Sequence, residues 1–160
     1  MIRPVTPADA AAIAAIYNPY IRDTTITFEE EEVTPEEIAS RIAKITKTYP
    51  WIVWEEDGIV LGYAYGSSWR TRHAYRFATE TAIYVSQDCR RKGIGIQLYN
   101  ALLEALRQKG FHSVLGCLGL PNDPSVRLHE KLGFKKIAHM REAGWKFNAW
   151  VDVGFWELIL

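Results

Sequence analysis

The stretch Val85–Ile96 brings together an ending apolar run, a basic loop and two glycines that open a helical pattern. Glycine lets backbone N–H groups approach a ligand closely, and a helix N-terminus offers free N–H donors with a partial positive charge. A second buried run, Ser113–Leu120, follows the helix. This strand–helix–strand order predicts a crossover within a mixed α/β sheet, with an anion site where the helix begins.

The residues of this loop are candidates for holding a pyrophosphate. Gly-x-Gly alone is weak evidence, and a loop with three solvated cations is the plain alternative. The strand before the loop, the basic residues in it and the helix after it favour phosphate binding. The third glycine of a dinucleotide fingerprint and the Gly-Lys-Ser/Thr end of a P-loop are both missing, so nucleotide hydrolysis is not expected. The candidates are Arg90, Arg91, Lys92, Gly93 and Gly95.

The rest of the chain alternates between helical and strand-like patterns. Thr6 and Thr34 each precede a proline and carboxylates, which is the signature of a capped helix start. Asp57-Gly58 predicts a tight hairpin turn between two β-rich runs. The expected strands are 51–55, 59–66, 77–85, 113–120, one from 133 and 150–160, and the later helices are 93–109 and 124–132. These elements predict a mixed sheet with helices on both faces.

Length and composition restrict the class of protein. The 160 residues suit one domain, 1–160, and contain 19 basic and 19 acidic side chains. Zero net charge argues against a protein that coats nucleic acid. Cys89 and Cys117 form no CxxC pair, so we expect no metal site and a reducing compartment. The first residues lack the apolar stretch of a signal peptide and no run is long enough to span a membrane, which predicts a cytoplasmic protein without a membrane partner.

Two blocks resemble the conserved motifs of the GNAT acetyltransferase superfamily. One is Arg90-x-x-Gly93-x-Gly95 after a strand, and the other is the segment from Asn122 to Phe134. The segments 49–51, 84–86, 119–127 and 152–156 are similar to phosphinothricin acetyltransferases and methionine sulfoximine acetyltransferases. The resemblance covers almost the entire chain. It implies an acetyl-CoA-dependent N-acetyltransferase that acts on the amino group of a small, amino-acid-like substrate.

The same resemblance implies how acetyl-CoA would bind. In this fold, the fourth and fifth strands of a mostly antiparallel sheet are parallel and splay apart to admit the pantetheine arm. Here these strands would be 77–85 and 113–120. The implied contacts are backbone groups of Ile83, Tyr84 and Val85 along the arm, Arg90, Arg91, Lys92, Gly93, Ile94, Gly95 and Ile96 at the pyrophosphate, Asn122 on the arm and Lys131 at the nucleotide end.

Acetyl transfer to an amine needs a base, because an aliphatic amine is mostly protonated at neutral pH. Glu80 is the one carboxylate in an otherwise apolar or hydroxyl-bearing run, 77–83. The alternative is that Glu80 is an exposed residue on a strand with one face in solvent. The resemblance to phosphinothricin acetyltransferases places a base at this glutamate, acting directly or through water.

His129 is the second candidate, because histidine gives or takes a proton near neutrality. Many GNAT enzymes carry a tyrosine at this point, whereas the phosphinothricin acetyltransferases share the histidine. A helix-surface histidine without a catalytic task is the alternative. Tyr99 is a further possible proton donor, although its place beside Leu98 and Leu102 favours packing. A backbone N–H near Val85, freed by a strand bulge, would polarise the carbonyl.

A covalent acetyl-cysteine is disfavoured. Cys89 lies where the pyrophosphate should sit, and Cys117 is a small apolar residue in mid-strand by default. Direct transfer in a ternary complex is therefore expected.

The acceptor is expected to be an anionic small molecule. The loop Trp69–Arg76 carries three arginines, and Arg forks suit carboxylates and phosphorus- or sulfur-bound oxygens. Solvated arginines or RNA contact are the alternatives. The resemblance assigns acceptor contacts to Phe28, Arg70, Arg72, His73 and Tyr75. A zwitterion such as phosphinothricin, methionine sulfoximine or methionine sulfone fits this loop.

Two rival functions stay open. A GNAT enzyme could acetylate another small amine, a protein N-terminus or a lysine, and a non-catalytic sensor could bind acetyl-CoA without turnover. The arginine loop argues against the protein acceptor, and the presence of Glu80 and His129 argues against the sensor.

The tail carries more large aromatic side chains than a small edge strand needs for its own core. Phosphinothricin acetyltransferases are typically homodimers, and we expect a homodimer here. The aromatic residues are Trp145, Phe147, Trp150, Phe155 and Trp156.

Overall fold

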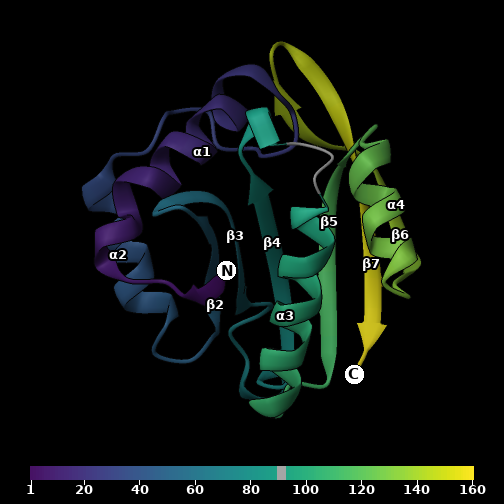
Figure 1. Ribbon diagram of the computed structural model, residues 1–160. Coiled ribbons are helices and arrows are strands. Elements are labelled where there is room, and N and C mark those ends of the chain that lie inside the picture. Colours follow the sequence, from purple (N-terminus) through teal and green to yellow (C-terminus); the bar gives the residue numbers. More distant parts are fainter. Residues whose placement is uncertain (90–92) are drawn as a thin grey trace.

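The computed structural model describes residues 1–89 and 93–160, and its centre is a single twisted sheet (Figure 1). Within these residues the sheet has seven strands in the order β1-β2-β3-β4-β5-β7-β6. All neighbours are antiparallel except β4 and β5, which are parallel. The strands are β1 (Ile2–Pro4), β2 (Trp51–Glu56), β3 (Ile59–Ser68), β4 (Ala78–Val85), β5 (Ser113–Leu120), β6 (Lys135–Lys146) and β7 (Ala149–Ile159). The predicted mixed, mostly antiparallel sheet is confirmed.

Helices cover both faces of the sheet, as predicted. The α-helices are α1 (Ala10–Asp23), α2 (Pro35–Ile45), α3 (Ile94–Gln108) and α4 (Asp123–Lys131), and the short 3-10 helices are η1 (Pro7–Asp9), η2 (His73–Tyr75) and η3 (Gln87–Cys89). The helices α1 and α2 lie together on one side, whereas α3 and α4 lie across the other (Figure 1). None of the helices in the described part of the chain is long and apolar enough to cross a membrane.

The predicted caps and turns are present. The side chain of Thr34 accepts a hydrogen bond from the backbone N–H of Glu37, which starts α2. Asp57 and Gly58 have φ values of 50° and 77°, and such a pair of left-handed residues matches the twist of a β2–β3 hairpin. At the N-terminus, one turn of η1 precedes α1, and Asp9 forms an ion pair with Arg3 of the unpredicted strand β1 at 2.8 Å.

Two apolar cores lie on opposite faces of the sheet. One core packs α3 on the sheet and includes Leu98, Leu102 and Leu106. The other packs α1 and α2 against β2 and β3. Side chains alternate between faces along a strand, so neighbouring residues of β4 belong to different cores. This alternation decides which residues of β4 can approach each helix.

The C-terminal strands differ from the prediction in one respect. β7 lies between β5 and β6, so it is an interior strand and β6 forms the edge. Trp156 is consequently buried in the core at 2% exposure, rather than contributing to an aromatic surface. Trp145, Phe147 and Trp150 remain 49%, 55% and 60% exposed around the β6–β7 turn.

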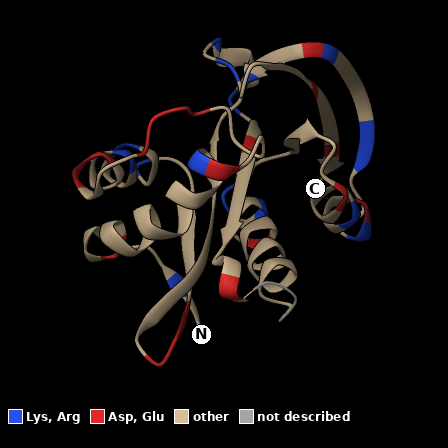
Figure 2. Ribbon diagram, turned by 90° about the horizontal axis from the view of Figure 1, so that it is seen from above, with Lys and Arg blue, Asp and Glu red and all other residues tan. Residues whose placement is uncertain are grey.

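Charges of both signs are spread over the elements in Figure 2, in keeping with zero net charge. The densest acidic stretch is the 29–32 segment that leads into α2. Part of it is neutralised, because Glu29 pairs with Arg41 at 2.7 Å and Glu32 pairs with Arg22 at 2.7 Å.

Candidate active site

The parallel strands β4 and β5 form a fork. They pair only from Ala78 with Ser113 to Thr81 with Gly116, although β4 continues to Val85 and β5 to Leu120. Beyond Thr81 the side of β4 that faces β5 therefore has no strand partner. Unpaired backbone groups on a strand edge can bind an extended ligand as if it were a further strand. The predicted splaying of these strands is confirmed.

A cavity of about 240 Å³ lies at the fork, and residues from both sides of the sheet line it. Some of the predicted site residues line this cavity and others do not. Among those predicted, Phe28, Glu80, Ile83, Tyr84, Asn122 and His129 line it. The other lining residues are Ile26, Thr27, Tyr65, Thr81, Ala82, Cys117, Leu118, Gly119, Ser125 and Val153.

Glu80 is the only acidic residue among these lining residues. It occupies the third position of β4 and is partly buried, with Thr79 and Thr81 on the opposite face of the strand. Burial raises the pKa of the Glu80 carboxyl above its usual value. A carboxylate with a raised pKa is a stronger base, so the cavity favours proton abstraction here.

His129 reaches the cavity from α4, on the side of the sheet opposite to Glu80. It is 2% exposed, and Nδ1 lies 2.8 Å from the carbonyl oxygen of Ser125 while Nε2 lies 2.9 Å from the Tyr99 hydroxyl. Burial lowers the pKa of His129, although the hydrogen bond to Ser125 opposes this shift. The ring lies over Gly116, where an added Cβ would stand 2.3 Å from Nε2. Glycine at this position is what makes room for the imidazole.

The loop predicted to bind the pyrophosphate is partly described. Gly93 ends it in the left-handed conformation, with φ 75° and ψ 7°, and forms the N-cap of α3. Ile94 is buried and anchors the first turn of α3. Gly95 and Ile96, which follow it, are partly exposed. The predicted Arg90, Arg91 and Lys92 lie outside the described residues. The left-handed cap agrees with the prediction that this turn requires glycine.

The expected bulge in β4 is absent from this strand. Its register with β3 runs without a shift from Thr79 opposite Ser68 to Val85 opposite Gly62. The separation of β4 from β5, rather than a bulge, therefore leaves backbone groups near Tyr84 without a strand partner. Val85 itself packs towards α3, and its carbonyl oxygen accepts a hydrogen bond from the Tyr20 hydroxyl at 2.6 Å.

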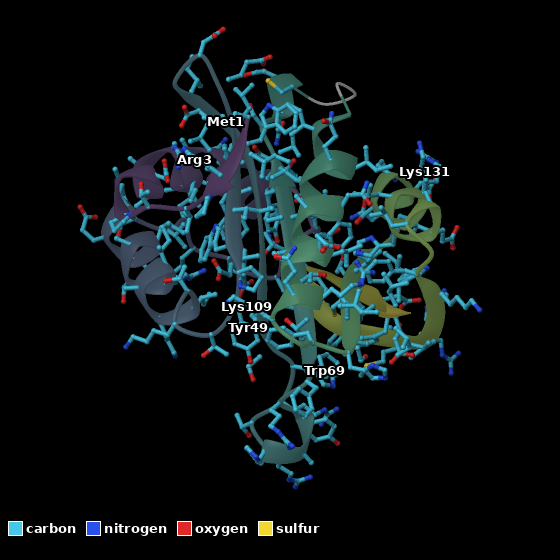
Figure 3. The ribbon with its side chains drawn as sticks, turned by 60° about the horizontal axis from the view of Figure 1, so that its bottom comes forward. Met1, Arg3, Tyr49, Trp69, Lys109 and Lys131 are labelled. Atoms are coloured by element: carbon cyan, nitrogen blue, oxygen red, sulfur yellow. The ribbon has the colours of Figure 1, made fainter. Side chains whose placement is uncertain are left out.

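Asn122 caps α4 at the mouth of the fork. Its side-chain oxygen accepts a hydrogen bond from the backbone N–H of Ser125 at 3.3 Å. The amide NH₂ makes no hydrogen bond within the described residues, so it can donate to a ligand. Lys131 lies on the exposed last turn of α4 and does not line the cavity (Figure 3).

The arginine loop lies apart from the cavity of its own chain. The segment around η2 that begins near Trp69 projects beyond the end of the sheet in Figure 3. Arg70, Arg72, His73 and Tyr75 are exposed, and none of them lines the cavity. The Arg70 guanidinium lies over the rings of Trp69 and Tyr75, at 5.3 and 5.9 Å from the centroids. Phe28, by contrast, stands at the cavity and packs against Gly119 and Gly144.

Comparison with known proteins identifies the family. The family model described as acetyltransferase (GNAT) domain matches residues 2–154. The chain belongs to this GNAT family. It is 46% identical over 156 residues to a phosphinothricin N-acetyltransferase from Streptomyces viridochromogenes, covering 98% of this chain and 85% of the relative. It is 37% identical to an L-methionine sulfoximine/L-methionine sulfone acetyltransferase from Pseudomonas aeruginosa, covering 99% and 94%.

A solved GNAT structure agrees with the fold. The crystal structure of a phosphinothricin acetyltransferase from Sinorhizobium meliloti in complex with acetyl-CoA has a TM-score of 0.96 and 36% identity, covering 100% of this chain and 88% of that one. The resemblance seen in the motifs is therefore confirmed over the length of the chain.

Two residues of this GNAT site differ from what the sequence suggested. Tyr99 is fully buried, as its position beside leucines predicted, yet its hydroxyl contacts His129 and lies 2.6 Å from the Thr81 hydroxyl. Cys117 lines the cavity instead of only filling the core. Burial raises the pKa of Cys117 to about 11, with a further contribution from the Glu80 charge. The sequence named Tyr99 as a possible proton donor, but it carried no signal for the partners of its hydroxyl or for Cys117 at the cavity, because these contacts join strands and helices far apart in the chain.

Proposed function

We propose that this chain transfers the acetyl group of acetyl-CoA to the α-amino group of a small amino-acid analogue. The observation that carries the proposal is the cavity at the β4–β5 fork, where Glu80 and His129 enter from opposite faces of the sheet. A base, a proton-transfer group and an unpaired strand edge thus meet in one space. The names of the related acetyltransferases support the choice of phosphinothricin, methionine sulfoximine and methionine sulfone as substrates.

The described residues fit acetyl-CoA as the co-substrate. The open edge of β4 at 82–85 can pair with the amide groups of the pantetheine arm, and the Asn122 amide can donate to it. The N-terminus of α3, capped by left-handed Gly93, provides free N–H groups for the pyrophosphate. At Gly95 an added Cβ would meet its nearest neighbour at 3.8 Å, so the backbone remains approachable. Acetyl-CoA would supply the activated acetyl group.

Glu80 acts as the base in this proposal. The acceptor arrives as an ammonium ion, and Glu80 takes one proton from it, directly or through a water molecule. The amine nitrogen then forms a bond to the acetyl carbon while the bond from that carbon to sulfur breaks. Because burial raises the pKa of Glu80, the carboxylate is a stronger base than one in water.

His129 handles the remaining proton. The amine nitrogen loses a second proton, which His129 accepts and then gives to the departing sulfur. Because burial lowers the pKa of His129, its ring is neutral at neutral pH and can accept this proton. Direct transfer is favoured over an acetyl-cysteine intermediate. The Cys117 thiol has a pKa of about 11, so little of it is the reactive thiolate near neutrality.

Recognition of the acceptor combines apolar and anionic contacts. Phe28 and Tyr84 give the described cavity an aromatic wall, and no lysine or arginine is among its described lining residues. A cation for the carboxylate must therefore come from outside this lining, and Arg70 and Arg72 are our candidates. Their exposure and the projecting loop in Figure 3 leave their side chains accessible.

We also propose that the chain is a homodimer in the cytoplasm. Trp145, Phe147 and Trp150 form an exposed aromatic group at the β6–β7 turn, which a second copy would cover. The two cysteines are unpaired, which suits a reducing compartment.

The test is thiol release from acetyl-CoA with a panel of amines at equal concentration. The expected result is a kcat/KM for the three amino-acid analogues at least tenfold above that for lysine and for peptides with a free N-terminus. Higher values for the peptides would replace the proposal with a protein acetyltransferase. Binding of acetyl-CoA without turnover of any amine would indicate a sensor.

A further inference from the structure

Both ring nitrogens of His129 are occupied by protein groups. The Ser125 carbonyl can only accept, so Nδ1 carries the hydrogen of the neutral ring and Nε2 presents its lone pair to the Tyr99 hydroxyl. A substrate therefore cannot reach either nitrogen without displacing a partner. Thr81 lines the same cavity as His129, and its hydroxyl contacts the Tyr99 hydroxyl.

The hydrogens of the hydrogen-bonded series from Thr81 through Tyr99 to His129 can be placed by elimination. When His129 is neutral, the single Tyr99 hydrogen must point to Nε2, because that nitrogen has no hydrogen of its own. The Thr81 hydroxyl then donates to the Tyr99 oxygen, 2.6 Å away. The hydrogen bonds run in one direction, from the cavity-lining Thr81 through Tyr99 to His129.

The same series of hydrogen bonds accommodates a protonated His129. Nε2–H would donate to the Tyr99 oxygen, Tyr99 would donate to Thr81, and Thr81 would turn its hydrogen to the carbonyl oxygen of Leu115 at 3.2 Å. Every group remains paired in both states, which is required of a buried polar network. The direction of all the hydrogen bonds reverses together.

We propose that Thr81 and Tyr99 form a proton relay between the cavity and His129. The inference rests on the proposed acetyl transfer. The second proton of the amine nitrogen passes to Thr81, the Thr81 hydrogen passes to Tyr99 and the Tyr99 hydrogen passes to Nε2 of His129. The reverse movement gives that proton to the departing sulfur. Glu80 then releases its proton to water, so the protein returns to its starting state, and the ammonium has lost one proton to the solvent through Glu80 and one to the sulfur.

The surroundings of His129 suit such a relay. Burial raises the pKa of Tyr99, so its hydroxyl stays neutral and keeps its hydrogen near neutral pH. Tyr99 and Phe134 pack against the imidazole at centroid distances of 5.1 and 5.0 Å. Among the residues that the structure describes, the other titratable groups lining the same cavity are Glu80, Cys117, Tyr65 and Tyr84.

The first test is nitrogen NMR of protein labelled with ¹⁵N-histidine. The chain has four histidines, and the signal lost in His129→Gln assigns the one of interest. We expect the neutral ring to carry its hydrogen on Nδ1, with Nε2 unprotonated. A neutral ring protonated on Nε2 would overturn the proposal whatever the enzyme's activity, so this result is separate from the test of acetyl transfer.

The second test combines variants with turnover. Tyr99→Phe removes the partner of the charged Nε2–H, so the pKa of His129 in the NMR titration should fall and kcat should drop about tenfold. Thr81→Val should act in the same direction, and Thr81→Ser should restore the wild-type values. Acetyl-CoA affinity should not change in any of them.

The matched control is Tyr49→Phe, since Tyr49 stacks on Phe111 at the far end of the sheet beside Lys109 (Figure 3). It should leave kcat and the His129 titration unaltered. If Tyr99→Phe behaves like Tyr49→Phe, the relay is wrong. Gly116→Ala provides a variant with all hydroxyls intact: its Cβ would displace the imidazole, and kcat should fall as in Tyr99→Phe. An undiminished kcat there would also count against the relay.

Discussion

Replacing Glu80 with glutamine isolates the role of its charge. Glu80→Gln keeps the size of the side chain and its capacity for hydrogen bonds, but the amide cannot accept the proton of an ammonium ion. General-base contributions are about 100- to 10,000-fold, or about 2.7 to 5.4 kcal/mol in activation free energy. No second acidic group among the described lining residues can replace it. We therefore expect kcat at neutral pH to fall at least about a hundredfold.

The dependence on pH separates loss of a base from loss of structure. The wild-type rate should rise with pH as Glu80 ionises, through a pKa above the ordinary value for glutamate, because burial raises it. The variant should lack this rise, and its defect should shrink at alkaline pH because more amine arrives already neutral. The assay is thiol release with phosphinothricin from pH 5.5 to 9.5, measured as kcat and kcat/KM.

Stability provides an independent check on the same substitution. A glutamate whose pKa is raised by folding binds its proton more tightly when folded, so its contribution to the free energy of unfolding is lost as pH rises through that pKa. Glu80→Gln should therefore gain stability relative to wild type between pH 4 and pH 8 in urea unfolding. Glu104→Gln, at an exposed position of α3, is the control and should change neither rate nor this trend. If kcat/KM of Glu80→Gln stays near wild type at neutral pH, Glu80 is not the base.

Three further substitutions test separate parts of the site. Gly93→Val puts a β-branched side chain on a left-handed residue at the N-cap of α3, so acetyl-CoA affinity should fall sharply in calorimetry while circular dichroism stays native; unchanged affinity would refute the pyrophosphate site. Arg72→Ala should raise the KM of the acceptor about 10- to 100-fold, as expected for a lost charged hydrogen bond, and equal damage to acetyl-CoA binding would show a structural role. Trp150→Glu, at a side chain 60% exposed, should convert a dimer to a monomer in light scattering, whereas a wild-type monomer at micromolar concentration would contradict the dimer.

Much of the fold follows from local patterns in the sequence. Thr34-Pro35 and Asp57-Gly58 fix a helix start and a hairpin turn through contacts within a few residues. The order of strand, helix and strand around 77–120 predicted the crossover that forms the fork. Glu80 became a candidate as the one carboxylate of the 77–83 run and His129 through its proton chemistry, with support from the family resemblance in both cases, and both line one cavity in the structure.

Other features depend on pairings that the sequence does not encode locally. β1 has three residues, too few for a period-2 pattern, and it exists because it pairs with β2. The position of β7 between β5 and β6 buries Trp156, although its neighbours suggested an exposed tail. The contact between Tyr99 and His129 joins residues thirty positions apart on two helices, and the leucine pattern of α3 shows only that Tyr99 is buried.

The most direct test of acetyl transfer by this protein follows the label from acetyl-CoA carrying ¹³C in its acetyl group. Wild-type protein is mixed with this acetyl-CoA and L-phosphinothricin, and the small molecules and the intact protein are analysed by mass spectrometry over several turnovers. Direct transfer should give one labelled acetyl group on the amino nitrogen of phosphinothricin, one thiol released for each product and no label on the protein. Label retained on Cys117 and then passed to the acceptor would contradict direct transfer. Acetyl-CoA binding with no labelled product from phosphinothricin, methionine sulfoximine or methionine sulfone would contradict the proposed function.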